Sequence, residues 1–128
     1  MIYLDTSVAL AHLLAEDRAP PAELWREPLV ASRLLEYELW VRLHALDLMA
    51  THGEAARTVL ERVAILELIA PVLERAVAPF PSPVRTLDAL HLASADFLRQ
   101  QRVAVRVATY DQRLSEAARA MGLGTYDL

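Results

Sequence analysis

The chain opens with a short apolar run that ends in an acid and two hydroxyls, Met1-Ile2-Tyr3-Leu4-Asp5-Thr6-Ser7. An apolar run containing Ile and Tyr predicts a buried strand, and Thr6 or Ser7 can cap a helix that begins at Val8. Asp5 is therefore expected where a strand passes into a helix. At that edge of a parallel α/β sheet, strand carboxyl ends and helix amino ends converge, and ligands bind. Asp5 could equally be a turn or capping acid, since Asp is common in both roles.

Strand-like and helix-like stretches alternate along the rest of the chain. Strands are expected at 29–31, 64–69 and 103–109, and helices at 8–14, 21–26, 33–49, 54–63, 71–77, 86–100 and 112–121. Gly53 is expected to break the chain between two helices, and the three prolines of Pro79-Phe80-Pro81-Ser82-Pro83 predict a loop. The alternation predicts a three-layer α/β/α fold with a central, mostly parallel sheet, formed by residues 1–128 as one domain.

The composition excludes several classes of site. There is no cysteine, which excludes disulfides, thiolate metal sites and a cysteine nucleophile. No segment has the roughly 18 unbroken apolar residues of a membrane span and the start lacks a basic region, so a cytoplasmic protein is expected. All 13 basic residues are Arg, and the net charge is −4. This acidity argues against a nonspecific duplex binder but leaves open a nuclease that gathers carboxylates around a metal ion.

Two acids lie close together on the helix expected at 33–49. On a helical wheel Glu38 falls among apolar residues such as Leu34 and Val41, whereas Glu36 falls on the polar side. A carboxylate on an apolar face is costly unless it is paired, protonated or bound to a metal ion. Glu38 is therefore a candidate ligand, and an ion pair with Arg42 at i+4 is the alternative.

The helix expected at 86–100 carries two further acids and a histidine. Asp88 lies in its first turn, where an acid already stabilises the helix dipole. His91 could orient Asp88 or reach a substrate, but a packed helix histidine is the simpler interpretation. Asp96 is expected to be a surface acid near Arg99 and Gln100.

Asp111 repeats the arrangement at Asp5, because an apolar strand, a hydroxyl, an acid and a helix follow one another there. As a helix N-cap it is explained locally. Taken together, however, Asp5, Glu38, Asp88 and Asp111 are four carboxylates that a parallel sheet could bring to one edge. Such a set suits a hard divalent cation and favours Mg²⁺ or Mn²⁺ over Zn²⁺.

These residues resemble the motifs of PIN-domain ribonucleases and, within them, of the VapC toxins of bacterial type II toxin–antitoxin modules. The resemblance covers most of the chain. The segments that carry it are Leu4-Asp5-Thr6-Ser7, Ser32-Arg33-Leu34-Leu35-Glu36-Tyr37-Glu38-Leu39, Leu87-Asp88-Ala89-Leu90-His91-Leu92-Ala93-Ser94-Ala95 and Ala108-Thr109-Tyr110-Asp111.

The resemblance implies a metal-dependent endoribonuclease that leaves a 5′-phosphate and a 3′-hydroxyl. Its four acids would bind Mg²⁺ or Mn²⁺ directly or through water, and Asp111, the only acid in its turn, could bind indirectly. Thr6 and Thr109 would be hydroxyls that orient carboxylates or water. The candidate RNA contacts are Arg85, Arg99 and Arg113.

The resemblance also implies a homodimer and a cognate VapB-like antitoxin that blocks the site, with no membrane partner. Trp25, Leu39, Trp40 and Leu43 are candidate apolar residues for those surfaces, and core packing is an equally good interpretation for each.

Two other functions compete with a ribonuclease. The first is a catalytically silent α/β interaction module whose acids are helix caps and ion-pair partners. The second is a phosphotransferase with Asp5 as the nucleophile. It is disfavoured because the acid expected two residues beyond such a nucleophile is absent, and position 7 is Ser.

Overall fold

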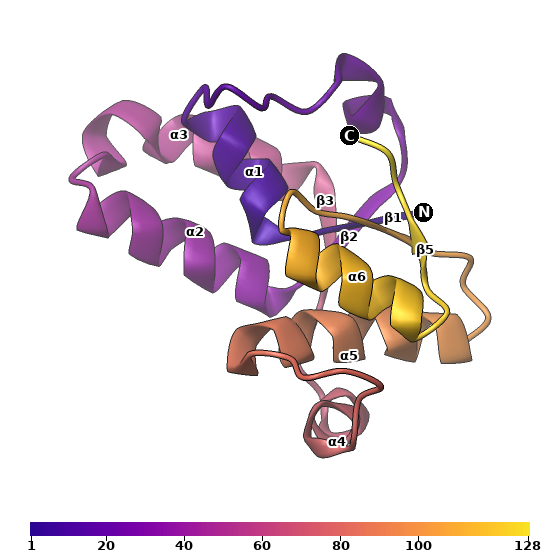
Figure 1. The fold of residues 1–128 in the computed structure, drawn as a ribbon. Coiled ribbons are helices and arrows are strands. Elements are labelled where there is room, and N and C mark those ends of the chain that lie inside the picture. The colour runs from indigo at the N-terminus through magenta and orange to yellow at the C-terminus, as the bar shows by residue number, and fades with distance from the viewer.

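The computed structural model describes all of residues 1–128 and has five strands in one sheet, all parallel, in the order β3-β2-β1-β4-β5 (Figure 1). The strands are β1 (Ile2–Leu4), β2 (Leu29–Ser32), β3 (Val63–Leu66), β4 (Arg106–Ala108) and β5 (Gly124–Thr125). The helices are α1 (Thr6–Leu13), α2 (Arg33–Ala45), α3 (Met49–Glu61), α4 (Ala70–Val77), α5 (Thr86–Gln100), α6 (Gln112–Ala120) and a 3₁₀ helix, η1 (Ala22–Arg26).

Helices cover both faces of this sheet, because successive side chains of each short strand point to opposite faces. Ile2 and Leu4 of β1 pack into a cluster with side chains of α1, α2 and α3. Tyr3, between them, packs into a second cluster with side chains of α5 and α6. The predicted three-layer α/β/α fold is confirmed (Figure 1). None of the helices combines the length and apolar character needed to cross a membrane.

The strand order reverses at β1, which lies between β2 and β4. In open parallel sheets, ligands bind in the crevice beyond the strand ends at such a reversal. Asp5 follows β1 directly, and its backbone N–H donates to the carbonyl of Ala108 at the end of β4, 3.0 Å away. The strand ends that precede Asp5 and Asp111 therefore adjoin at this edge of the sheet.

Several boundaries differ from the sequence predictions. Helix α2 ends at Ala45, because the chain turns through Asp47 with φ 54°. Gly53, the predicted break, is instead buried inside α3. The strand expected at 103–109 is only β4, and the α1 N-cap is Asp5 rather than Thr6 or Ser7.

The prediction that Asp96 is a surface acid is wrong, because this residue is only 2% exposed, but it does lie beside Arg99 and Gln100 as expected. Helix α4 packs against α5, and Asp96 of α5 accepts hydrogen bonds from Arg75 Nε of α4 at 2.8 Å and Gln100 Nε2 at 3.2 Å. It also pairs with Arg99. Asp96 is therefore a structural link that holds α4 on the outside of α5.

Candidate active site

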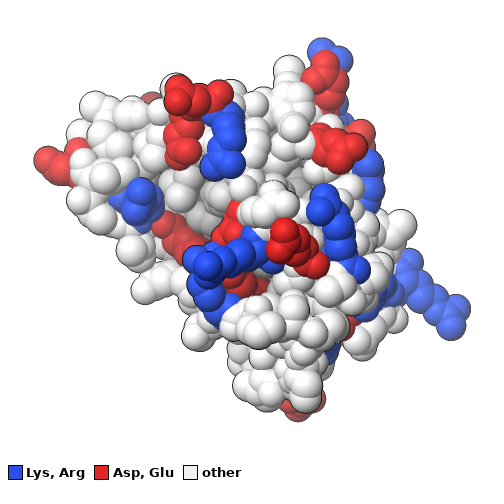
Figure 2. All heavy atoms as spheres, in the orientation of Figure 1, with Lys and Arg blue, Asp and Glu red and all other residues white.

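The four predicted acids line one cavity of about 840 Å³ at the strand reversal. Asp5 comes from the end of β1, Glu38 from α2, Asp88 from the first turn of α5, and Asp111 from the residue before α6. The other lining residues are Thr6, Ser7, Leu10, Arg42, Arg85, Thr86, Leu87 and His91. In Figure 2, acidic and basic side chains meet around a hollow near the centre of this face.

Asp5 is held by hydroxyls from both neighbouring strand ends. Its Oδ2 accepts hydrogen bonds from Ser7 Oγ at 2.6 Å, Thr109 Oγ1 at 2.8 Å and the Ser7 backbone N–H at 3.3 Å. Its Oδ1 lies 3.6 Å from His91 Nε2. Thr109 Oγ1 also accepts from the Asp111 backbone N–H at 2.9 Å. One oxygen of Asp5 is thus fixed, and the hydroxyl of Thr109 ties the β4 end to it.

Glu38 is held in the same way, through one oxygen only. Its Oε1 accepts from Thr6 Oγ1 at 2.8 Å and from His91 Nε2 at 2.7 Å. The alternative ion pair with Arg42 does not form. Glu38 does not lie on a wholly apolar face as predicted, because Val41 is 48% exposed and Glu38 lines the cavity.

His91 lies beneath these two carboxylates and is 3% exposed. Its Nε2 faces Glu38, and its Nδ1 lies 2.8 Å from the Tyr3 hydroxyl. Burial opposes protonation of the ring, but the Tyr3 hydroxyl, Glu38 and Asp5 outweigh it and raise the pKa of His91 to about 10. A protonated ring gives Asp5 and Glu38 a buried counter-charge. The prediction of a packed histidine was right about burial but missed this role, because the spacing on α5 pointed to Asp88 and nothing in the sequence pointed to Tyr3.

Asp88 and Asp111 share a different cation, Arg85. Arg85 Nε donates to Asp88 Oδ2 at 2.9 Å, and its other end pairs with Asp111 Oδ2. The hydrogen bond to Asp88 and the charges of both carboxylates raise the pKa of Arg85. Asp111 also caps α6, since its Oδ1 accepts from the backbone N–H groups of Arg113 and Leu114. The side chain of Arg85 is 60% exposed, so this counter-charge lies at the rim of the cavity.

The donor chemistry of the cavity fits a hard divalent cation, because four carboxylates and the hydroxyls of Thr6 and Ser7 surround it. As the side chains stand, no three acids or histidines are grouped closely enough to hold an ion. Arg85 accounts for part of this spacing, since it lies between two of the acids. A cation shared by Asp88 and Asp111 would have to displace Arg85 from them.

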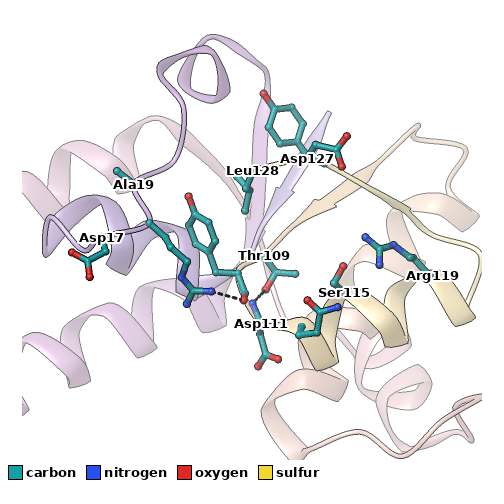
Figure 3. Close-up of a pocket in the computed structure, with 12 residues that line it drawn as sticks. Asp17, Ala19, Thr109, Asp111, Ser115, Arg119, Asp127 and Leu128 are labelled. Carbon is teal, nitrogen blue, oxygen red and sulfur yellow. Dashed lines mark hydrogen bonds between the residues drawn. The ribbon is translucent and has the colours of Figure 1, made fainter.

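A second cavity, of about 440 Å³, adjoins the first through Asp111 (Figure 3). Arg18 is one of the residues that line it, and its guanidinium lies 5.0 Å from the centroid of the Tyr110 ring. In Figure 3 the carboxylate of Asp111 points away from Asp127 and Leu128. Asp111 therefore lies where the two cavities meet, with its carboxylate directed away from the C-terminal residues that line the second one.

The predicted arginines separate into two groups. Arg85 lines the acidic cavity, and Arg113 lies beside Arg85 and Asp88 in a smaller adjoining cavity. Arg99 instead lies near the end of α5, where it donates to the Met121 carbonyl and pairs with Asp96, so the expectation that it would reach the acidic edge is not met. Arg42 also lines the cavity, although it was not among the arginines predicted to contact RNA.

The four apolar residues considered for either a binding surface or the core are wholly or partly buried. Leu39 and Leu43 are fully buried, and Trp25 and Trp40 are partly buried against the same cluster. The core interpretation is therefore correct for the two leucines. The most exposed large apolar side chains lie elsewhere, on α2 and α4.

Comparison with known proteins agrees with this architecture. The sequence matches the PIN domain family over residues 2–120. It is 33% identical to Ribonuclease VapC47 of Mycobacterium tuberculosis over 132 aligned residues, covering 98% of this chain and 95% of the relative. It is 34% identical to Ribonuclease VapC46 of the same species, covering 95% of this chain and 93% of the relative. It is 33% identical to Ribonuclease VapC35, also of that species, covering 96% of this chain and 93% of the relative.

The fold and the site together define a class: parallel α/β domains with an acid-lined cavity where the strand order reverses. The match over nearly the whole length of the chain specifies the class further. This chain belongs to the PIN-domain family, and its curated relatives are VapC ribonucleases.

Proposed function

We propose that the chain is a VapC-like endoribonuclease toxin of a toxin–antitoxin system, which hydrolyses RNA phosphodiester bonds with Mg²⁺ or Mn²⁺. The observation that carries the proposal is the convergence of four acids, distant in sequence, on one cavity of about 840 Å³. The similarity to VapC ribonucleases supports RNA as the substrate. In this proposal Asp5, Glu38, Asp88 and Asp111 hold the cation, directly or through water.

A bound divalent cation would lower the pKa of an attacking water and stabilise negative charge on the phosphate in the transition state. The chain's own residues prepare for this chemistry. Ser7 and Thr109 fix one oxygen of Asp5, and Thr6 fixes one oxygen of Glu38. Each carboxylate keeps its second oxygen available to the cavity.

Arginines at the rim are suited to hold the RNA backbone. Arg42 lines the cavity and forms no ion pair, and Arg85, once displaced from its acids, would also be free to meet a phosphate. Arg113 lies close by. A guanidinium can donate two parallel hydrogen bonds to a phosphate, so these side chains can place the scissile bond over the acids.

A homodimer and a VapB-like antitoxin are proposed partners, and the cytoplasm is the proposed compartment for an RNA-cleaving toxin held by its antitoxin. The exposed apolar face of α4 supports a protein–protein contact. Ile69, Leu73 and Val77, spaced four residues apart, are 40%, 44% and 87% exposed. Helix α4 packs on α5, and none of its residues lines the acidic cavity. The apolar face is therefore separate from that cavity.

A catalytically silent interaction module remains the second candidate, because one set of observations favours it. Asp5 and Asp111 do cap helices, and Asp88 does pair with Arg85. These roles explain three acids locally, but they do not explain why Glu38 joins the same cavity.

One assay distinguishes the two candidates. Purified chain freed of antitoxin is incubated with total RNA and Mg²⁺ or Mn²⁺, beside the variants Asp5→Asn and Asp88→Asn. Asp47→Asn is the matched control, because Asp47 is an exposed acid in a turn with φ 54°, a conformation that Asn also adopts readily. A ribonuclease predicts cleavage by the wild type and the control only. No cleavage by the wild type with either ion, or equal cleavage by all variants, contradicts the proposal.

A further inference from the structure

A buried chain of hydrogen bonds runs from the start of α2 to Glu38. The hydroxyl of Tyr3, which is 0% exposed, accepts from the Ser32 backbone N–H at 3.3 Å. The same hydroxyl lies 2.8 Å from His91 Nδ1, and His91 Nε2 lies 2.7 Å from Glu38 Oε1. Ser32 is the N-cap of α2 and Glu38 lies within the same helix. The hydrogen-bond network therefore links the start of α2 to a side chain further along it.

The two donors of Glu38 act on one oxygen and leave the other free. Thr6 and His91 both bond Oε1, and Oε2 has no hydrogen bond. Asp5 is arranged alike, since its Oδ2 takes all of its donors and Oδ1 has only His91 Nε2 nearby, at 3.6 Å. The ring nitrogen of His91 is thus the one group that approaches both carboxylates.

A flexible glutamate needs such support to present an oxygen at a fixed place. The side chain of Glu38 is 23% exposed, whereas that of His91 is 3% exposed. Every buried polar side-chain atom of the protein has a hydrogen-bond partner. Partners of this kind, behind the ligands of a metal ion, orient the ligands and tune their affinity. Both ring nitrogens of a buried histidine need polar partners, and here one partner is a candidate metal ligand, Glu38 of α2, while the other is Tyr3 of β1.

We propose that His91, held in place by Tyr3, is a positioning residue that fixes Glu38 and Asp5 for the divalent cation. This inference rests on the proposed function. It adds two residues, Tyr3 and His91, that touch neither RNA nor the reacting atoms. It also explains why an aromatic hydroxyl lies in the otherwise apolar cluster between β1 and α5.

The test compares two substitutions of His91 that keep different halves of the ring. Asparagine places its amide near the position of Nδ1, so His91→Asn loses the donor to Glu38. Glutamine reaches the position of Nε2, so His91→Gln keeps that donor. Mn²⁺ affinity, measured by electron paramagnetic resonance of the free ion, should fall roughly tenfold in His91→Asn and stay within about threefold of the wild type in His91→Gln. Equal losses in both variants, or no loss in either, would overturn the proposal.

A second pair tests Tyr3 and does not disturb the ring. Tyr3→Phe removes the hydroxyl, and Ser94→Ala is its control, because Ser94 is 0% exposed on the same helix as His91 and its hydroxyl donates only to the Leu90 carbonyl. Both variants lose one buried hydroxyl, but only Tyr3→Phe should weaken Mn²⁺ binding and lower kcat for RNA, with KM unchanged. Matching affinities for the two variants would refute a role for Tyr3. A wild type that neither binds Mn²⁺ nor cuts RNA would instead overturn the proposed function itself.

Discussion

Replacing Asp5 with asparagine should separate the structural role of this residue from its role in binding a cation. The three hydrogen bonds that Asp5 accepts all end on Oδ2. An asparagine carbonyl oxygen can accept the same three, and Asn and Asp are equally good N-caps. In the absence of divalent ions, the free energy of unfolding of Asp5→Asn should therefore stay within about 1 kcal/mol of the wild type.

The two proteins should differ once Mn²⁺ is added. At a concentration 100 times the Kd, binding stabilises the wild type by about 2.7 kcal/mol. For a chain of 128 residues this corresponds to a rise in Tm of roughly 10 °C. If the loss of one carboxylate weakens binding about 100-fold, the same Mn²⁺ concentration stabilises Asp5→Asn by only about 0.4 kcal/mol, or roughly 2 °C.

Differential scanning fluorimetry of both proteins, with and without Mn²⁺, measures this difference. Asp47→Asn serves as the control for removing an acid from the surface, and its Tm should respond to Mn²⁺ as the wild type does. An equal rise in Tm for Asp5→Asn and the wild type would refute the assignment of Asp5 to the cation. A large loss of stability in metal-free Asp5→Asn would refute the claim that asparagine preserves the cap.

Three further predictions concern charged side chains, two at the acidic cavity and one away from it. Arg85→Gln should bind Mn²⁺ several-fold more tightly in calorimetric titrations, because Arg85 competes for two carboxylates; an affinity equal to that of the wild type would contradict this. Asp96→Asn should lower the free energy of unfolding in urea by about 2–4 kcal/mol without changing RNA cleavage, because Asp96 is buried and paired but remote from the cavity. The raised pKa of His91 means that its stabilising contribution is complete below pH 6.5 and is lost as the pH rises toward 10. Urea titrations should show this decline in the wild type, and His91→Gln should lack it; the same decline in both would refute the assignment to His91.

The sequence predicted the positions of the acids best where a motif adjoined a strand end or a helix start, whereas their role in binding a cation stays a prediction. Asp5 directly follows β1, and Asp111 follows the short turn after β4. Residues in such positions lie at the carboxyl edge of a parallel sheet. The order of alternating elements then predicted the three layers. The register of the strands and the reversal at β1 could not be predicted, because they depend on pairing between segments far apart in the chain.

The errors arose where a distant partner decides the role of a residue. Asp96 has the sequence context of a surface acid, and only the docking of α4 on α5 buries it beside Arg75. His91 was matched to Asp88 by spacing along one helix, whereas its actual partners come from β1 and α2. Gly53 was expected to mark the break between two helices, but the left-handed conformation of Asp47 provides that turn instead. Local patterns contain no information about such contacts.

An anomalous difference map from crystals soaked in Mn²⁺ would test the central claim most directly, because it locates the ion without reference to activity. The expected result is a peak inside the cavity among Asp5, Glu38, Asp88 and Asp111, with Arg85 turned away from its two acids. No peak at saturating Mn²⁺, or a peak bound only by residues outside this cavity, would contradict it.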